Sequence, residues 1–473
     1  MEVSQKQEGL SLRGILAYAH GKIAESVLVY TISIMALPIY SIGLGISPSL
    51  IGLAIGVPRL WDGLIDPSIG YWSDNTRSRF GRRKPFLVIG IILAALCYAL
   101  LWSPPIGIGK MAVFIYFLVF SMVFYTCAAL FLVPYYALGN ELTPDYHIRT
   151  KLMSYCVMFL GIAGIFTPWA YNLCFCPYFG TNEIEGVRVI GIIGGSLIIL
   201  TGLLPVMFCK ENFAAQSQPK CHFISAIKST LKNKPFIMLC GVLLLGLFGI
   251  LLVAPMAFYV GTYYMFGGDT SQMSKLYGVL GSSWAITTII SSPIIYRLVK
   301  YFDKKVVLVS SLLLAMLGQG MQWYTFNPAH PYWSVLSYIL TSPGVAALFT
   351  IVLSWLADVC DFDELQSGLR REGIFSAVYN LISKAGFAAA TLFSGILISV
   401  AGVNTTVGAV QSPEVILRLR LLFSIVPPLV ILLALILTVF YPLNASSMRE
   451  IRAELDKRNS DKGLCKGAGV GTT

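Results

Sequence analysis

Long apolar runs recur along the entire chain, and no other feature restricts its fold as strongly. Twelve of them reach about 20 residues, the length that a membrane-spanning helix needs. Only 12% of the residues are charged, about half of the share found in soluble proteins. The predicted spans cover residues 14–42, 48–72, 84–103, 111–140, 152–175, 187–209, 235–265, 274–298, 304–325, 332–357, 372–401 and 419–442. A transmembrane β-barrel would show shorter segments of alternating hydrophobicity, so the sequence predicts an all-α membrane protein with twelve transmembrane helices.

The basic residues outside the spans predict an orientation. Lysine and arginine gather on alternate connecting segments: residues 73–84 and 210–234 hold five each and residues 444–473 hold six, whereas the segments on the other side hold five in total. Because basic residues favour cytoplasmic loops, we expect both termini in the cytoplasm. The net charge of +11 then reflects topology, and no nucleic-acid partner is expected. Residues 1–13 are polar, so we expect no cleavable signal.

A polar segment divides the spans into two sets of six. This central loop, residues 210–234, separates an N-terminal six-helix bundle at 1–209 from a C-terminal one at 235–443, and a cytoplasmic tail follows at 444–473. The loop after span two, GYWSDNTRSRFGRRKPF, has an echo after span eight, IIYRLVKYFDKKVVLV. Two repeats with a solute site between them near mid-membrane are typical of the major facilitator fold. We expect the polar, Gly-rich tail to be mobile.

The loop after span two places an acid, Asp74, among basic residues that include Arg77, Arg82 and Arg83. The arginines act as a topology signal. The acid suggests a second role, in which Asp74 pairs with basic residues and braces one state of a gate. The sequence is compatible with both roles.

Three charged residues lie inside span two, where a charge costs at least ~2.5–3.5 kcal/mol. The spacing of Arg59, Asp62 and Asp66 puts all three on one helix face. The two carboxylates repel each other, so one should hold a proton more tightly, and a proton or small cation between them relieves the repulsion. Arg59 offsets one negative charge. We therefore predict a cation site at Asp62 and Asp66; the alternative is a static ion network that only holds helices together.

Two further intramembrane charges need partners. Lys384 lies about a dozen residues inside span eleven, and a buried lysine requires a carboxylate. We expect it to reach across the interface between the bundles to Asp62 or Asp66, where it would compete with the cation; the alternative is an amine that extends to the end of its helix. Glu25 follows Lys22 by three residues on span one, which fits either an internal ion pair or a contact with polar groups of a solute.

Motifs of common enzyme classes are missing. The chain has neither the GxxxxGK[ST] motif of nucleotide-binding loops nor the HExxH motif of zinc peptidases. No nucleophile–base set stands out. We therefore expect no enzyme activity, no metal and no cofactor beyond a co-transported H⁺ or Na⁺.

Three stretches resemble one transporter family. They are RLWDGLIDPSIGYWSDNTRSRFGRRKPF at 59–86, VPYYALGNELTPDYHIRTKL at 133–152 and ADVCDFDELQSGLRREGIFSAVYNLISKAG at 357–386. In order and position they resemble the motifs of the glycoside–pentoside–hexuronide:cation symporters, the melibiose permease family. The resemblance implies a bacterial inner-membrane carrier that couples sugar uptake to H⁺, Na⁺ or Li⁺.

The resemblance also implies roles for single residues. Asp62 and Asp66 match the family's cation-binding carboxylates, Arg59 matches their neighbour, and Lys384 matches the lysine of span eleven.

Other family positions are changed. The sugar-binding acids of spans one and four and the sugar-binding arginine of span five fall on Ser26, Leu132 and Val157, and two neutral cation ligands fall on Ile65 and Ala129. Because Na⁺ needs several oxygen ligands and a proton needs one carboxylate, these changes favour H⁺ over Na⁺.

The solute site is less well defined by the sequence. Aromatic rings stack on sugar faces, although a ring in a span is more often a packing residue. We name Glu25, Tyr125, Tyr379 and Asn380 as candidate substrate-binding residues. The expected partners are a small-molecule solute, a sugar, and the lipid bilayer around a monomer. Two alternatives stay open: the same fold carrying a lysophospholipid-like amphipath, and a membrane sensor that transports nothing.

Overall fold

The structure, a computed structural model, describes residues 10–143, 145–180, 182–209, 233–368 and 371–467. Its described part is helical, with no strand. In the first half, the helices are α1 (Leu12–Ala36), η1 (Leu37–Gly43), α2 (Pro48–Asn75), α3 (Lys84–Leu101), α4 (Lys110–Glu141), α5 (Tyr146–Phe166), η2 (Thr167–Trp169), α6 (Ala170–Leu173) and α7 (Glu183–Phe208).

The second half continues the series after the central loop, of which 210–232 lie outside the described residues. Its helices are α9 (Lys234–Leu251), α10 (Val253–Val260), η3 (Gly261–Met265), α11 (Thr270–Tyr301), α12 (Lys304–Gly320), α13 (Gln322–Thr325), η4 (Pro331–Trp333), α14 (Ser334–Ala347), η5 (Leu348–Val352), α15 (Leu353–Ser367), α16 (Glu372–Val400), α17 (Pro413–Val439) and α18 (Ala445–Gly467).

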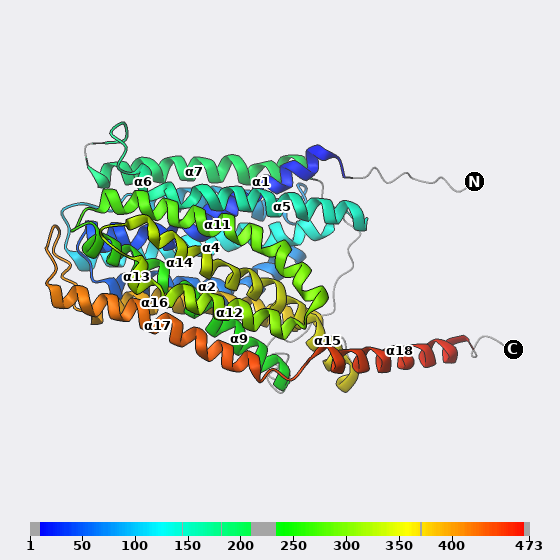
Figure 1. Cartoon of the computed structure of the whole chain (residues 1–473). Helices are drawn as coiled ribbons and strands as arrows, with labels where there is room; N and C mark the ends of the chain where they lie inside the picture. The colour runs from blue at the N-terminus through cyan, green and yellow to red at the C-terminus, as the bar shows by residue number, and fades with distance from the viewer. Residues whose placement is uncertain (1–9, 144, 181, 210–232, 369–370, 468–473) are drawn as a thin grey trace.

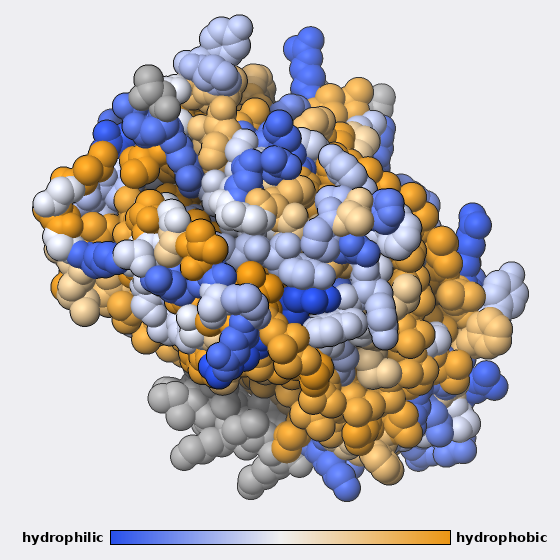
Figure 2. Space-filling model, turned by 60° about the vertical axis from the view of Figure 1, so that its left-hand side comes forward, coloured by the Kyte–Doolittle hydropathy of each residue, from blue (hydrophilic) through white to orange (hydrophobic). Residues whose placement is uncertain are grey.

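These helices form the twelve predicted spans. Within the described residues, eleven helical stretches are long and apolar enough to cross a membrane. The twelfth, α2, has 28 residues and packs among the others, but its charged residues lower its hydropathy. Both termini lie at one end of the bundle, which we call the terminal end, and the opposite end is the far end (Figure 1). Hydrophilic side chains gather on the far end and hydrophobic ones cover a flank (Figure 2).

Polar residues mark the helix starts at both ends of the bundle. The side chains of Asn233 and Asp303 accept hydrogen bonds from the backbone N–H groups of Phe236 (3.1 Å) and Lys305 (2.8 Å). Asp269 caps α11 in the same way. Each such cap contributes about 1 kcal/mol to helix stability, and each begins a helix close to the predicted edge of a span.

The two halves meet mainly where α2 packs along α16. A Cβ added to Gly52 would lie 2.9 Å from the carbonyl oxygen of Thr391, and one added to Gly56 would lie 3.1 Å from that of Ala388. Residues without a side chain therefore let the two backbones approach closely, as small residues do in membrane helix pairs. This contact extends from the far end to the middle of the bundle and aligns the charged stretch of α2 with α16.

Hydrogen bonds also join the halves at the far end. Trp169 Nε1 donates to Ser282 Oγ (2.8 Å), and Asn172 Nδ2 donates to Ser274 Oγ (2.9 Å), both between the α5–α6 region and α11. At the terminal end, the first turns of α5 line an open hollow of about 680 Å³ whose walls include Arg149. The halves are thus hydrogen-bonded to each other at the far end, and the hollow on α5 lies toward the terminal end.

The tail differs from the prediction. Residues 445–467 form helix α18, which extends beyond the bundle at the terminal end (Figure 1), so the expectation of a mobile tail is wrong for this segment. Met448, Ile451 and Leu455 are buried, at the spacing of one helix face. Asn444 accepts a hydrogen bond from Ser447 N (2.9 Å) and caps the helix. This short apolar stripe is the feature of the sequence from which α18 could have been predicted.

Candidate functional site

The charged residues of spans two and eleven form one cluster. Lys384 Nζ on α16 lies 2.8 Å from Asp62 Oδ2 and 2.6 Å from Asp66 Oδ2 on α2. The structure thus brings the three residues together as the sequence predicted, with the lysine reaching across the interface between the halves rather than extending to the end of its helix. One ammonium group bridges two carboxylates, and the bridge joins the two halves.

The local sequence of α2 makes room for this bridge. Gly63 lies between the two acids, and a Cβ there would be 2.9 Å from Leu381 Cδ1 and 3.4 Å from Lys384 Cδ. The lysine side chain therefore passes over a position without a side chain. Pro67 lies inside the helix and has no N–H to donate to the carbonyl four residues earlier. The carbonyl group of Gly63 consequently lacks its usual helical partner beside the carboxylates.

The cluster has unused capacity for a cation. The side chain of Asp62 is only 6% exposed and that of Asp66 is 27% exposed. Oδ1 of Asp66 is buried and has no hydrogen-bond partner. Two carboxylates and one ammonium leave one negative charge, and a buried carboxylate oxygen without a partner is costly. A proton or monovalent cation at Asp66 would neutralise the remaining negative charge and would also give Oδ1 of Asp66 a partner.

Arg59 does not neutralise these acids by direct contact. It forms no ion pair within 4.0 Å in the described part of the chain; its guanidinium carbon instead lies 5.4 Å from the ring centre of Tyr125 on α4 and 5.5 Å from that of Phe387 on α16. The expectation that Arg59 offsets one negative charge therefore stays a prediction, without a direct ion pair behind it. The amine of Lys384 takes that position, and the longer guanidinium group lies between two aromatic rings.

Glu25 is engaged by its neighbour on α1. Its Oε2 lies 2.6 Å from Lys22 Nζ, and that ammonium also lies 4.6 Å above the ring centre of Tyr136 on α4. Glu25 itself is 9% exposed. Of the two interpretations of this acid, the internal ion pair is the one that the structure contains, while Tyr136, which the sequence analysis did not select, is 43% exposed beside it.

The structure places the other three candidate substrate-binding residues, Tyr125, Asn380 and Tyr379, in different surroundings. Tyr125 is buried beside Arg59, and its hydroxyl makes no hydrogen bond of standard geometry. Asn380 is exposed and lies one helical turn before Lys384, on the same face of α16. Tyr379 is 7% exposed and packs in the apolar core of the second half. Its ring therefore offers little surface to a solute, and it is a poor candidate.

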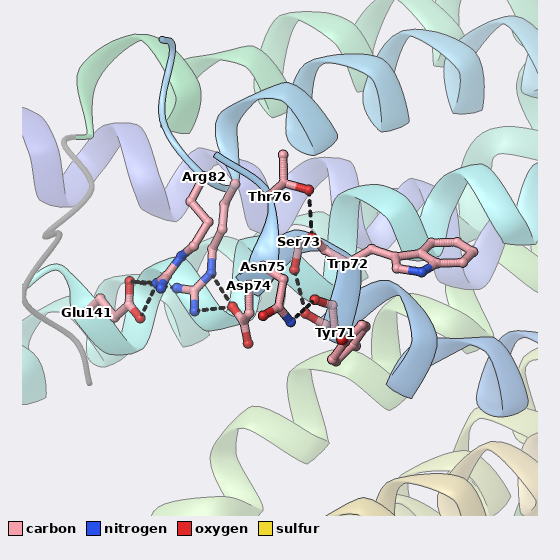
Figure 3. A network of polar contacts seen from close by, with 10 residues as sticks. Tyr71, Trp72, Ser73, Asp74, Asn75, Thr76, Arg82 and Glu141 are labelled. Atoms are coloured by element: carbon pink, nitrogen blue, oxygen red, sulfur yellow. Dashed lines mark hydrogen bonds and ion pairs between the residues drawn. The ribbon is translucent and has the colours of Figure 1, made fainter. Parts of the chain in front are cut away.

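The loop after α2 carries an ion network at the terminal end (Figure 3). Arg83 lies 2.8 Å from Asp74 Oδ1 and 2.7 Å from Glu141 Oε2, and Arg82 lies 2.9 Å from Glu141 Oε1. The predicted pairing of Asp74 is present. Glu141, at the end of α4, was missed, although its stretch had been singled out. Arg77 is exposed and takes part in no ion pair that the described residues show.

The second half has a corresponding network at the same end. Asp358 on α15 is buried and lies 2.5 Å from Lys304 Nζ, and Arg452 of α18 approaches it to 3.1 Å. Arg371 lies 2.5 Å from Asp363; its hydrogen bond to that carboxylate raises the pKa of the Arg371 guanidinium above the usual arginine value. The echo after span eight pointed to Lys304, but not to its partner on α15.

Comparisons with known proteins agree with this architecture. The family of MFS/sugar transport proteins matches residues 17–445. The symporter YnaJ of Bacillus subtilis is 26% identical over 97% of each chain. The glucuronide carrier protein homolog of Escherichia coli is 24% identical over 95% of this chain and 96% of its own. The sodium-dependent lysophosphatidylcholine symporter 1 of Gallus gallus is 25% identical over 95% and 90%.

A solved structure supports the fold. The crystal structure of a bacterial homolog of the human lysosomal transporter Spinster, in an inward-facing and unoccupied conformation, superposes with a TM-score of 0.63 at 16% identity, over 94% of this chain and 97% of that one. The fold is that of membrane transporters rather than of enzymes. The chain belongs to the MFS/sugar transport protein family, among the glycoside–pentoside–hexuronide:cation symporters that its motifs indicate.

Proposed function

We propose that this protein is a secondary transporter that couples a sugar or sugar derivative to H⁺ by alternating access. The observation that carries the proposal is the bridge from Lys384 to Asp62 and Asp66. A charged cluster that joins two rigid bundles links ion binding to their relative motion, because any ion that binds the carboxylates changes the strength of the bridge.

The bridge suggests how coupling works. In the empty carrier the ammonium contacts both carboxylates, so the halves can reorient with one excess buried negative charge instead of two. A proton on Asp66 removes one acceptor of Lys384, and the bridge then depends on Asp62 alone. The α2–α16 contact is weakened at the charged stretch, and solute binding between the halves sets the new arrangement. Ion binding and solute binding thus shift the same equilibrium, that between two arrangements of the halves, as coupling requires.

The surroundings of the cluster support H⁺ rather than Na⁺. Hard cations such as Na⁺ need several oxygen ligands, and the positions of the family's neutral ligands carry Ile65 and Ala129. On α4, the hydroxyl of Thr126 is already engaged: it accepts a hydrogen bond from Trp61 Nε1 (3.1 Å) and donates to the carbonyl of Met122 (2.8 Å). A proton needs only the free oxygen of Asp66.

The orientation follows from the basic residues. The terminal end carries the arginine-rich loop after α2 and the lysines at the start of α12, which the positive-inside rule assigns to the cytoplasm. On this basis both termini lie inside a bacterial inner membrane, and the hollow on α5 faces the cytoplasm. We further propose that the carrier is a monomer.

A second function has one observation in its favour. A relative of similar identity is named a lysophosphatidylcholine symporter, and the acids with which melibiose-type carriers bind sugar are replaced here by Ser26 and Leu132. A lipid-like solute would use the apolar walls between the halves. It would give ion-coupled uptake with a lysophospholipid and none with any sugar.

The test is the pH of a weakly buffered suspension of energy-depleted cells that express the protein. Glycosides, pentoses, hexuronates and lysophosphatidylcholine are added one at a time, with and without Na⁺. Alkalinisation on adding one sugar class, abolished in Asp66→Asn, would support the proposal. A response to the lipid alone would support the second function. Solute uptake that needs Na⁺ and moves no protons would contradict the choice of ion, and no response to any solute would contradict transport.

A further inference from the structure

A pocket at the terminal end lies where three helices of the second half meet. The start of α12, the body of α15 and the first turns of α18 contribute its walls, and its volume is about 230 Å³. A single water needs about 10–15 Å³ on the same measure, so the pocket has room for a larger group. Lys384 and its carboxylate partners are not part of its lining, and the coupling mechanism does not use it.

The lining of this pocket combines apolar and charged groups. Trp355 of α15 is 1% exposed, and its ring stacks on that of Tyr441 with the ring centres 3.9 Å apart. Leu443 and Met448 are also buried and line the pocket. A ligand in the pocket would therefore contact apolar surface as well as charged side chains.

The two acids of the lining are already engaged. Asp303 accepts one hydrogen bond from a backbone N–H at the start of α12 (2.8 Å) and another from the start of α18 (3.0 Å), and Lys305, two residues later, balances its charge. Asp358 lies 2.5 Å from Lys304 Nζ and 3.1 Å from Arg452 Nη2. These carboxylates have little capacity left for a cation, so the pocket is not suited to a positively charged ligand.

Arg449 of α18 is the cation of the lining that lacks a counter-charge. It is exposed and takes part in no ion pair or hydrogen bond within the described part of the chain. Its neighbours Lys304 and Arg452 share the carboxylate of Asp358, and Arg452 also lies 3.2 Å from Asp361. Three cations thus face two carboxylates, and one positive charge remains. Arginine presents five N–H donors in a planar fork that fits phosphate.

The pocket lies at the level where the membrane spans end. Helix α12 begins at Lys304, and α17 ends at Val439, four residues before the pocket residue Leu443. Tyr301 and Phe440, close to the pocket in the chain, are 83% and 71% exposed, and aromatic side chains are enriched at the membrane interface. Lipid headgroups lie beside the hydrocarbon core at this depth, and basic pockets between helices bind anionic headgroups there.

We propose that this pocket binds a phosphate group with one negative charge and that Arg449 is its principal ligand. A bound phosphate would neutralise the remaining charge and would join cations from α12 and α18, so it would stabilise the base of the second half. The headgroup of an anionic phospholipid and a soluble phosphate share this chemistry, and the position at the membrane interface favours the lipid. The inference does not depend on the proposed transport function.

The first experiment follows the melting temperature of the purified full-length protein in a neutral detergent. Short-chain phosphatidylglycerol, short-chain phosphatidylcholine or inorganic phosphate is added in increasing amounts. Phosphatidylglycerol should raise the melting temperature to a plateau, and phosphatidylcholine should not. In Arg449→Gln the apparent dissociation constant should rise roughly 10- to 100-fold, as expected when charge-assisted hydrogen bonds are lost. Because Arg449 is exposed, this variant should melt like the wild type without lipid.

Lys457→Gln is the matched control. Lys457 is exposed on the same helix, does not line the pocket, and its substitution changes the net charge equally. A response to phosphatidylglycerol alone would identify a lipid headgroup as the ligand, and an equal response to inorganic phosphate would identify a soluble phosphate. Equal effects of the two lipids, no plateau with either anion, or the same affinity in the Arg449 and Lys457 variants would overturn the inference.

A second measurement detects the bound lipid directly. Native mass spectrometry of the wild type with excess phosphatidylglycerol should show one lipid that stays bound when the detergent is removed. In Arg449→Gln the fraction of protein that retains this lipid should fall severalfold, while in Lys457→Gln it should match the wild type. Equal retention in all three proteins would contradict a lipid headgroup at Arg449.

Discussion

The two halves of the molecule carry their charges in different ways. At the terminal end the halves match: Arg83 pairs with Glu141 in the first half, and Lys304 pairs with Asp358 in the second. In the middle of the bundle they do not match. The first half supplies Lys22, Glu25, Arg59, Asp62 and Asp66 to that region, and the second half supplies Lys384.

This difference separates two kinds of charged residue. An ion pair at the end of a helix helps to position a loop, and a bundle that is repeated needs it twice. An ion-coupling site is needed once per carrier, and it responds to motion between the halves only if both of them contribute. Repeated charges therefore indicate structure and gating, whereas charges that occur in one half indicate transport chemistry.

The largest effect should come from the carboxylates that are not repeated. Asp62→Asn and Asp66→Asn each remove an acceptor of Lys384 and the site of the co-transported ion. Because coupling free energies are about 1–3 kcal/mol, solute accumulation driven by a proton gradient should fall roughly 5- to 150-fold, measured as uptake in vesicles. Glu414→Gln, which changes an exposed ion pair with Arg418 at the far end, is the matched control. Accumulation that persists in both aspartate variants would mean that the cluster is structural.

The next effect concerns the lysine that the second half contributes. Lys384→Met leaves two neighbouring carboxylates without the ammonium that bridges them, and breaking a buried pair in this way costs about 3–5 kcal/mol. We expect a clear fall in the melting temperature in detergent. The double variant Lys384→Met with Asp62→Asn should recover part of it, because one of the two carboxylate charges left without the ammonium is gone. If the two changes were instead additive, Lys384 and Asp62 would not interact.

Some of these features could be predicted from the sequence, and the reason is physical. Charged residues are so costly in a membrane span that Asp62, Asp66 and Lys384 had few possible partners other than one another. The apolar runs located the spans for the same reason. The surroundings of Arg59 could not be predicted, because helix spacing places a side chain on a face but does not say whether a neighbour from another helix already occupies the contact with the carboxylates. In this structure Lys384 occupies it.

Other features depend on contacts that a single sequence does not reveal. Gly52 and Gly56 resemble the many glycines of the chain, and only the approach of α16 shows that they form the interface between the halves. Glu141 was visible in a quoted stretch, but its partners Arg82 and Arg83 come from the loop before α3. The helix α18 was missed because its stripe of three buried residues is short and lies in a polar segment.

The matched pairs at the terminal end allow a direct comparison of the halves. The Asp358 side chain is 4% exposed and contacts Lys304 and Arg452, whereas that of Glu141 is 16% exposed and contacts Arg82 and Arg83. Asp358→Asn should therefore destabilise more than Glu141→Gln, by about 2–3 against about 1.5–2 kcal/mol, within the range for hydrogen bonds to charged groups. Thermal unfolding in detergent measures both. The ratio of protons to solute transported should stay at its wild-type value in each, and a changed ratio would contradict the assignment of these charges to gating.

A smaller effect is expected at the uncharged part of the contact between the halves, where α2 packs along α16. Gly52→Ala would place a Cβ 2.9 Å from the carbonyl oxygen of Thr391, and overpacking of this kind costs about 1–3 kcal/mol. The α2–α16 contact should loosen and the uptake rate should fall, with the ratio of protons to solute unchanged. Gly373→Ala, where an added Cβ meets nothing within 4 Å, serves as the control. Equal rates in the two variants would mean that the close approach of α2 and α16 does not limit transport.

The smallest effect distinguishes the two roles proposed for the loop after α2. Asp74 is 51% exposed in its pair with Arg83, and exposed ion pairs contribute about 0.2–1 kcal/mol. Asp74→Asn breaks the pair but makes the loop more basic, which would strengthen a topology signal. Arg77→Gln weakens the signal and breaks no ion pair that the described residues show.

If the loop braces a gate, Asp74→Asn should change the uptake rate by up to a fewfold while Arg77→Gln leaves it unaltered. If the loop only sets topology, Arg77→Gln should lower the uptake rate and Asp74→Asn should leave it unaltered, because only the arginine variant then reduces the fraction of correctly oriented protein. Labelling of a cysteine introduced in the tail measures that fraction.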